Sequence, residues 1–293
     1  MPISGRIDLH MHSTVSDGTD SPEQLLSRVA EKGISLFSLT DHDAIKGGLE
    51  IIDLLKSGMP AFITGVEISC RDSEGKYHIL GYGYDPDAES IKSLVARSHS
   101  IRIGKLQKRL DQLKEKFGFV FTGDEIEGLK ALDNPGKPHL GNLMVRHGYA
   151  PDRDTAFKDF LNHISVKSEN IGPEEAIKEI MASGGIPVLA HGFFGDGDQL
   201  IIGDEMEQRM AKLKGMGLMG AEAFYNGFTP RLTRTMLEYA DRYDLFVTAG
   251  SDYHGTNKPL IELGDNGLDD LSDAPQRLIN FLSEIADRTF NVV

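Results

Sequence analysis

The chain has 293 residues, of which 40% are hydrophobic, and carries a formal net charge of −14 at pH 7. This length can bury a large core, either as one barrel-sized domain or as a domain with an insertion. The negative charge disfavours general electrostatic attraction to long nucleic acids, although a local cationic pocket could still bind small anions. No apolar run reaches the roughly 20 residues that a membrane span needs, and no signal peptide is recognisable, so we expect a cytoplasmic protein without a membrane partner.

In the first part of the chain, predicted strands alternate with predicted helices. Residues 6–10, in "RIDLH", alternate in polarity as a strand does, and Ser21-Pro22-Glu23-Gln24 has the pattern of a capped helix start. We predict a helix from Pro22 to Lys32, a strand over 34–40, a helix over 44–56, and strands over 61–69 and 77–84. The same alternation returns after residue 171, with helices over 173–183, before Gly215 and over 230–243, and strands over 186–191, 218–224 and 245–251. A regular alternation of this kind predicts an α/β fold with a mainly parallel sheet or barrel.

The interval between these two parts has a different pattern. Residues 88–116 predict a long helix rich in lysine and arginine, and shorter helices are predicted over 138–147 and 152–162. We therefore predict a discontinuous barrel domain formed by residues 1–86 and 171–293, and a helical insertion or cap formed by residues 87–170. Within the long helix, Arg102, Lys105 and Arg109 are interpreted as an exposed face.

Residues that can bind metals lie next to the predicted strands. His10 and His12 are two apart at the end of the first strand, so their side chains share a face. The other candidates are Asp17 and His42 in loops after strands, Glu67 at a strand end, His78 near a strand start, and His191, Asp252 and His254 after later strands. Catalytic sites of parallel sheets and barrels form at the carboxyl edge of the strands, so we expect these side chains to meet there.

The combination of these residues predicts a multinuclear metal site. Any one buried histidine or aspartate is more often a hydrogen-bonded core or loop group than a metal ligand. Several carboxylates and imidazoles in one place would be electrostatically unfavourable without cations, and two or three divalent ions would resolve this. Because Cys70 is the only cysteine, nitrogen and oxygen must supply the ligands, and a thiolate-rich zinc site and an internal disulfide are excluded. Such ligands are compatible with manganese, iron and zinc, and ligand type alone does not choose among them, although manganese is the ion that we expect first.

Six separated motifs resemble those of the polymerase and histidinol phosphatase (PHP) phosphoesterases, in the order that this family has them. They are "DLHMHSTVSDGT", "LTDHD", "GVEIS", "HILGYG", "AH" and "GSDYH". The resemblance implies a distorted (β/α)7 barrel of the PHP type, with a helical insertion and a trinuclear metal centre. Carried over by position, the first ion would be held by His10, His12, Glu67 and Asp252, the second by Glu67, His78 and His191, and the third by Asp17, His42 and His254.

Within this family, the chain is most similar to the bacterial branch that acts on nucleotides and other small phosphate esters. The predicted function is hydrolysis of nucleotides such as nucleoside 3',5'-bisphosphates, or of small cyclic phosphate diesters, with a metal-bridging hydroxide attacking phosphorus. The predicted catalytic residues are His191, His254 and Asp252. Either histidine could protonate the leaving oxygen, as could a metal-bound water, and the sequence does not choose between them.

The resemblance also indicates residues that bind the substrate. In "GKPHLGNLMVRHG", Lys137 replaces the arginine that the family usually has and is followed by His139, while Lys167 in "ISVKSEN" resembles a second phosphate-contacting lysine. A lysine offers a point charge where arginine offers a bidentate fork, so the phosphate would be oriented less tightly. The alternative interpretation is that these lysines are solvated surface charges.

Three other functions remain open. Metal-dependent amidohydrolases also begin with an H-x-H strand and end with an aspartate, although they do not account for "SDG", "TDHD" or the lysine segments. A phosphomonoesterase of the histidinol-phosphate type and a non-catalytic metal-binding module are the other two. Neither the oligomeric state nor the exact substrate can be read from the sequence.

Overall fold

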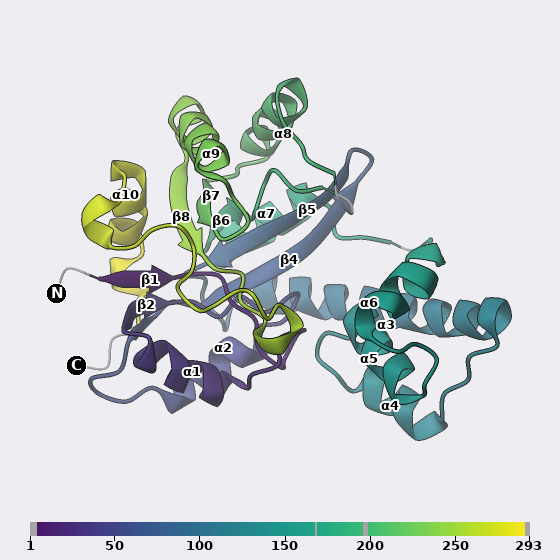
Figure 1. Ribbon diagram of the computed structural model, residues 1–293. Helices are drawn as coiled ribbons and strands as arrows, with labels where there is room; N and C mark the ends of the chain where they lie inside the picture. The colour runs from purple at the N-terminus through teal and green to yellow at the C-terminus, as the bar shows by residue number, and fades with distance from the viewer. Residues whose placement is uncertain (1–4, 168, 196–198, 291–293) are drawn as a thin grey trace.

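A computed structural model describes residues 5–167, 169–195 and 199–290. In this part of the chain, eight strands form two sheets (Figure 1). The smaller sheet contains β1 (Arg6–Asp8), β2 (Ile34–Phe37) and β3 (Ala61–Phe62), all parallel. The larger has the order β4 (Gly65–Asp72), β5 (Gly75–Tyr82), β6 (Ile186–Leu189), β7 (Gly220–Tyr225) and β8 (Phe246–Gly250).

The two sheets approach each other along both edges, where backbone hydrogen bonds and isolated bridges join them without forming a continuous ladder among the described residues. On one side, Leu9 N donates to Ala249 O (2.9 Å) and Met11 forms an isolated bridge with Tyr253; on the other, an isolated bridge joins His42 and Glu67. The α/β class is therefore as predicted, whereas a continuously hydrogen-bonded seven-stranded barrel is not found in the described ranges. The short β1 and β3, of three and two residues, leave little backbone for a closed ladder.

The alternation in the first half differs from the prediction at residues 61–84. The expected strand over 61–69 is divided into β3 and β4, and β5 then pairs antiparallel with both β4 and β6. At Gly65, the first residue of β4, the backbone passes close to Ser38, the residue after β2. A Cβ at this position would collide with Ser38 Oγ, so the close approach requires glycine. The parallel arrangement returns for β6, β7 and β8.

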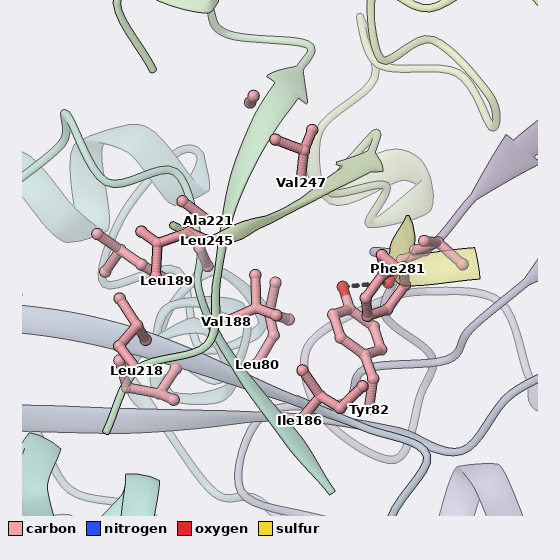
Figure 2. Packing of buried hydrophobic residues seen from close by; sticks show 14 of the residues in the cluster. Leu80, Tyr82, Ile186, Val188, Leu189, Leu218, Ala221, Leu245, Val247 and Phe281 are labelled. Atoms are coloured by element: carbon pink, nitrogen blue, oxygen red, sulfur yellow. Dashed lines mark hydrogen bonds between the residues drawn. The ribbon is translucent and has the colours of Figure 1, made fainter. Parts of the chain in front are cut away.

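Helices cover the sheets. The bounds are α1 (Pro22–Glu31), α2 (Lys46–Leu54), α7 (Pro173–Ala182), α8 (Asp204–Gly215), α9 (Pro230–Arg242) and α10 (Gln276–Glu284). The predicted start of α1 is confirmed, since Ser21 Oγ accepts from Gln24 N (3.2 Å) and Gln24 Oε1 accepts from Ser21 N (2.8 Å). Figure 2 shows side chains of β5, β6 and β7, among them Leu80, Val188 and Ala221, packed in the main hydrophobic cluster.

A second hydrophobic cluster lies in the interval predicted as an insertion. It is built from α3 (Glu89–Phe117), α4 (Gly123–Lys130), α5 (Lys137–Arg146), α6 (Arg153–Thr155), a π-helical turn (Ala156–Phe160) and a 3-10 turn (Leu161–His163). The start of α3 packs into the main cluster through Ile91 and Leu94, while its end packs into the second cluster through Leu106 and Leu110. In Figure 1, α4, α5 and α6 lie apart from the sheets beside the far end of α3. The division into two domains stays a prediction.

No helix in the described ranges is long and apolar enough to cross a membrane.

Candidate metal centre

The first two histidines lie just beyond β1 and are fully buried. Their Nε2 atoms approach the same carboxylate oxygen, Glu67 Oε2, at 3.4 Å for His10 and 3.2 Å for His12. Met11, between them, packs into a separate hydrophobic cluster with Phe37 and Leu39. The predicted common direction of the two imidazoles is therefore what the structure shows.

Glu67 is the centre of the arrangement. Its side chain is fully buried near the start of β4. Three imidazoles approach Oε2, namely His10 at 3.4 Å, His12 at 3.2 Å and His42 at 2.9 Å, and two approach Oε1, namely His78 at 2.6 Å and His191 at 3.1 Å. A carboxylate with imidazoles on both oxygens has the geometry of a bridging metal ligand.

Asp17 provides a second focus near the first. His254 Nε2 lies 3.1 Å from Asp17 Oδ1, and His12 Nδ1 and His42 Nε2 lie 3.9 and 4.0 Å from the same atom. The loop that carries Asp17 is shaped by buried Asp41, whose Oδ1 accepts from Ser13 N (2.8 Å) and Ser16 Oγ (2.6 Å). His42 thus faces Glu67 with one ring nitrogen and Asp17 with the other.

Asp252 joins the same group of side chains, since its Oδ1 lies 3.3 Å from His12 Nε2 and 3.6 Å from His10 Nε2. With Asp252 included, the structure brings all nine predicted ligands together. Three sets of side chains have ligand atoms close enough to share one ion: His12, Asp17, His42 and His254; His10, His12 and Glu67; and His42, Glu67 and His78. These sets overlap with the three predicted from the family resemblance without being identical to them. The assignment of each side chain to a particular ion stays a prediction.

The hydrogen bonds of two histidines show that the ring nitrogens facing the centre of the cluster suit a cation. His10 Nδ1 lies 2.9 Å from Glu222 Oε1, and if it donates its proton there, its other nitrogen presents a lone pair to Glu67 Oε2. His254 Nδ1 similarly pairs with the Asp252 carbonyl oxygen at 2.8 Å, so Nε2 presents a lone pair to Asp17. Two acceptors that face each other at 3.1–3.4 Å repel unless they share a proton or a cation, and a metal ion would serve both.

Unsatisfied atoms support the same conclusion. Among the described residues, ten buried side-chain atoms have no hydrogen-bond partner. Five of the ten belong to this cluster: His10 Nε2, His12 Nε2, Asp17 Oδ1, His42 Nδ1 and Glu67 Oε2. Buried polar atoms are normally paired, so their concentration at one point fits a site for divalent ions.

Between the protein groups alone, protons balance part of the charge. Burial lowers the pKa of His10, but the carboxylates of Glu222, Glu67 and Asp252 outweigh burial and hold this pKa well above its ordinary value. Burial raises the pKa of Glu67, but the surrounding imidazoles, first that of His42, hold it well below the usual range. Bound ions would replace these protons, so we expect metal binding to release protons and to weaken in acid.

Sequence reasoning missed Glu222, a fully buried carboxylate in the middle of β7. Its Oε1 pairs with His10 Nδ1, and its Oε2 accepts from the backbone N of His191 at 2.8 Å. One side chain therefore orients two predicted ligands, as outer carboxylates do in metal sites. His191 and Asp252 both have positive φ angles, of 32° and 58°, so the backbone at these two positions is in a strained region.

Of the two predicted substrate-binding lysines, one lines a cavity beside the metal cluster and the other does not. Lys137, at the start of α5, lines a cavity of about 340 Å³ next to the metal cluster, and half-buried His139 accepts from Gly136 N through Nδ1 (3.2 Å). Lys167 is exposed and lies outside the lining of this cavity; its carbonyl oxygen accepts from Lys108 Nζ.

The interpretation of Arg102, Lys105 and Arg109 as an exposed face is wrong. All three line the cavity, and Arg102 is paired with buried Asp43 through Nε (2.7 Å) and NH2. Their spacing puts them on one side of α3, and that side faces β4 and the metal cluster across the cavity.

Comparison with known proteins agrees with this site. Residues 8–167 match the family model described as "PHP domain". The chain belongs to the PHP domain family. It is 30% identical to a 5'-3' exoribonuclease of Haemophilus influenzae, over 90% of this chain and 95% of the relative. It is also 30% identical to a 3',5'-nucleoside bisphosphate phosphatase of Chromobacterium violaceum, over 88% of this chain and 90% of the relative.

Other relatives of this PHP chain have different names. A phosphoribosyl 1,2-cyclic phosphate 1,2-diphosphodiesterase of Eggerthella lenta is 30% identical over 85% of this chain and 94% of its own length. The crystal structure of a Bifidobacterium adolescentis protein described as a metal-dependent phosphoesterase superimposes with a TM-score of 0.79 at 28% identity, covering 95% and 96% of the two chains. The PHP chain is accordingly a metal-dependent phosphoesterase, with a buried cluster that fits several metal ions.

Proposed function

We propose that this PHP phosphoesterase hydrolyses small nucleotides that carry a second anionic group, such as nucleoside 3',5'-bisphosphates. The observation that carries the proposal is the cationic cavity next to the metal cluster. It has a volume of about 340 Å³, within the range of roughly 300–1,000 Å³ that is usual for small-molecule sites. Its lining contains Arg71, Lys76, Arg102, Lys105, Arg109 and Lys137, together with His42, His78 and Asp17 of the cluster.

One cation of α3, Arg109, lacks a full set of partners in the described part of the chain. Arg109 Nε is buried without a hydrogen-bond partner among the described residues. Burial, followed by the charge of Arg102, lowers the pKa of Arg109 to about 10, and burial together with Arg102 and Arg109 lowers that of Lys105 to about 8. Burial and mutual repulsion disfavour the charged forms of these side chains, so a bound anion would stabilise them.

A second cavity meets the first at the metal cluster. Its volume is about 320 Å³, and it shares Asp17, His42, Lys76 and His78 with the first cavity. The remaining lining includes the aromatic side chains of Tyr77, Phe194 and Tyr225. A molecule whose scissile phosphate lies at the cluster would have a cationic cavity on one side and an aromatic one on the other, which suits a nucleotide.

The protein groups have distinct roles in this reaction. When bound, divalent ions lower the pKa of a water molecule and neutralise phosphoryl oxygens. His10, His12, Asp17, His42, Glu67, His78, His191, Asp252 and His254 would hold those ions. Lys137 and Arg109 would bind the substrate's other anionic group, and His191 or His254, which both line the second cavity, would face the leaving oxygen.

A phosphate-release screen tests the proposal. The full chain, loaded with manganese, would be assayed on nucleoside 3',5'-bisphosphates, nucleoside monophosphates, short 5'-phosphorylated oligonucleotides and small cyclic phosphates. We expect the highest kcat/KM with a substrate that has two phosphates, and loss of phosphate release in His12→Ala and Asp252→Asn. Equal kcat/KM for substrates with one and two phosphates would contradict the role of the cationic cavity.

Cyclic phosphate diesters are the second candidate, favoured by the Eggerthella lenta relative. The screen separates the two functions, since a diesterase would open the ring of a cyclic phosphate before any phosphate is released. The screen also includes oligonucleotides, because the Haemophilus influenzae relative is named an exoribonuclease. The net charge of this chain leads to the opposite expectation, that long nucleic acids are not bound.

A further inference from the structure

The two carboxylate oxygens of Asp252 have different surroundings. Oδ1 faces the metal cluster, at 3.3 Å from His12 Nε2 and 3.3 Å from His254 Nδ1. Oδ2 faces away and accepts two hydrogen bonds, from Tyr225 OH at 2.9 Å and from Lys258 Nζ at 2.5 Å. One oxygen is thus available to an ion, and the other is held by two donors that the predicted ligand set did not include.

Tyr225 is fixed in place as a proton donor. It is the last residue of β7, where it pairs with Gly250 of β8. Its ring lies 5.4 Å from that of His191 and 5.1 Å from that of Phe228. With its ring held on both sides, its hydroxyl is directed at Asp252 Oδ2, to which it donates.

Lys258 reaches the same oxygen because the chain turns sharply after His254. The 3-10 turn Gly255–Asn257 ends at Lys258, whose N donates to Gly255 O (3.1 Å). Gly255 has φ 62°, and a Cβ there would collide with Thr19 Oγ1, so this position requires glycine. Asn257 Nδ2 donates to Asp17 O (2.7 Å) and fastens the turn to the loop of another predicted ligand.

We propose that Tyr225 and Lys258 are positioning residues for the metal centre, which hold Asp252 so that it binds an ion through Oδ1 alone. The inference rests on the proposed metal-dependent function. A carboxylate free to rotate could chelate one ion with both oxygens or turn away from the cluster. Two donors on Oδ2 remove both alternatives, and the second also places a fixed positive charge at the rim of the aromatic cavity.

The test measures metal affinity rather than activity. Lys258→Met and Tyr225→Phe each remove one donor with little change in volume, and Lys258→Arg keeps the charge and a donor. Lys32→Met is the matched control, because Lys32 forms an exposed ion pair with Glu262 (2.6 Å) that has no part in the site. Dissociation constants for Mn²⁺ and Zn²⁺ would be measured on the full chain by competition with a chromogenic chelator.

We expect the Kd to rise about 10–100-fold in Lys258→Met and in Tyr225→Phe, to stay unchanged in Lys32→Met, and to recover at least in part in Lys258→Arg. Cobalt loading adds a spectroscopic check, since the visible spectrum reports coordination geometry and should change in the first two variants only. Unchanged constants and spectra in both would overturn the inference, as would tighter binding in Lys258→Met, which would make Lys258 a competing cation.

Folding and the underlying function can be separated from this result. The metal-free melting temperature of each variant shows whether it folds, and Tyr225→Phe keeps the ring contacts even if Lys258→Met does not fold. A wild-type chain that binds no divalent ion would refute the proposed function and this inference with it. A wild-type chain that binds metal and releases phosphate, beside variants of unchanged affinity, would refute the inference alone.

Discussion

Replacing Glu222 by glutamine tests whether the cluster depends on an outer carboxylate. The substitution keeps the volume of a fully buried side chain in β7. It leaves one acceptor oxygen where two are in use, for His10 Nδ1 (2.9 Å) and His191 N (2.8 Å). If the amide oxygen keeps the backbone N of His191, its NH2 group faces His10 Nδ1. His10 must then carry its proton on Nε2, the atom that should bind the ion.

The expected cost follows from this change of tautomer. Loss of an outer partner typically weakens metal binding by about 10–100-fold, which corresponds to about 1.4–2.7 kcal/mol. With metal at about 100 times the wild-type Kd, binding stabilises the folded chain by about 2.7 kcal/mol. A tenfold higher Kd reduces this stabilisation by about 1.3 kcal/mol and the melting temperature by roughly 2 °C.

The assay is the shift in melting temperature on adding Mn²⁺, because the difference between metal-free and metal-loaded protein cancels any effect of the substitution on the metal-free fold. Glu262→Gln is the control, since Glu262 is a carboxylate in an exposed ion pair. We expect a smaller shift in Glu222→Gln and a normal shift in Glu262→Gln. A full metal-induced shift in Glu222→Gln, with unchanged metal content, would refute the argument.

Three further predictions concern α3. Arg109→Met should raise KM for a nucleoside bisphosphate at least tenfold while leaving KM for a simple aryl phosphate unchanged, as measured by phosphate release. Because the pKa of Lys105 is lowered to about 8, its charge is present below that pH and lost above it, so KM for the bisphosphate should rise between pH 8 and 10; a flat profile would contradict this. Arg102→Met leaves buried Asp43 without its cation and should destabilise the chain by about 1–3 kcal/mol in chemical denaturation.

The meeting of most of the candidate ligands could be predicted because strand geometry is local. The spacing of His10 and His12 fixes their common direction, and the loops after parallel strands meet at one edge. His78 is different, since it lies inside β5 rather than at a strand end. It reaches Glu67 because β4 and β5 pair antiparallel, with His78 opposite Ser69 and Glu67 opposite Leu80, which makes Glu67 and His78 diagonal neighbours on one face. That register is not readable from residue types.

Side chains whose role depends on distant segments were the ones that sequence reasoning missed. Glu222 lies in an apolar strand, and only its contacts with His10 and His191, which follow β1 and β6, show why a charge is buried there. The spacing of Arg102, Lys105 and Arg109 correctly indicates one helix face. It cannot show whether that face meets water or a cavity, because Asp43 and Asn170, which face Arg102 and Lys105, lie about 60 residues away in the sequence.

The overall charge and the local charge lead to a last prediction, about substrate length. The net charge of −14 repels a long polyanion, whereas the cationic cavity attracts a small one. At physiological salt, charges are screened beyond about 8 Å, so a nucleotide inside the cavity responds to Arg109 and Lys105 more than to the distant surface. Each further nucleotide that extends over the acidic exterior adds repulsion.

For 5'-phosphorylated oligonucleotides of increasing length, kcat/KM should therefore fall at low ionic strength, and the difference between short and long substrates should narrow as salt is added. The measurement is initial rates on a length series at two salt concentrations. Rates that increase with length, or a length dependence that salt does not change, would show that a surface beyond the cavity binds nucleic acid. In that case the cationic cavity would be the end of a longer binding track.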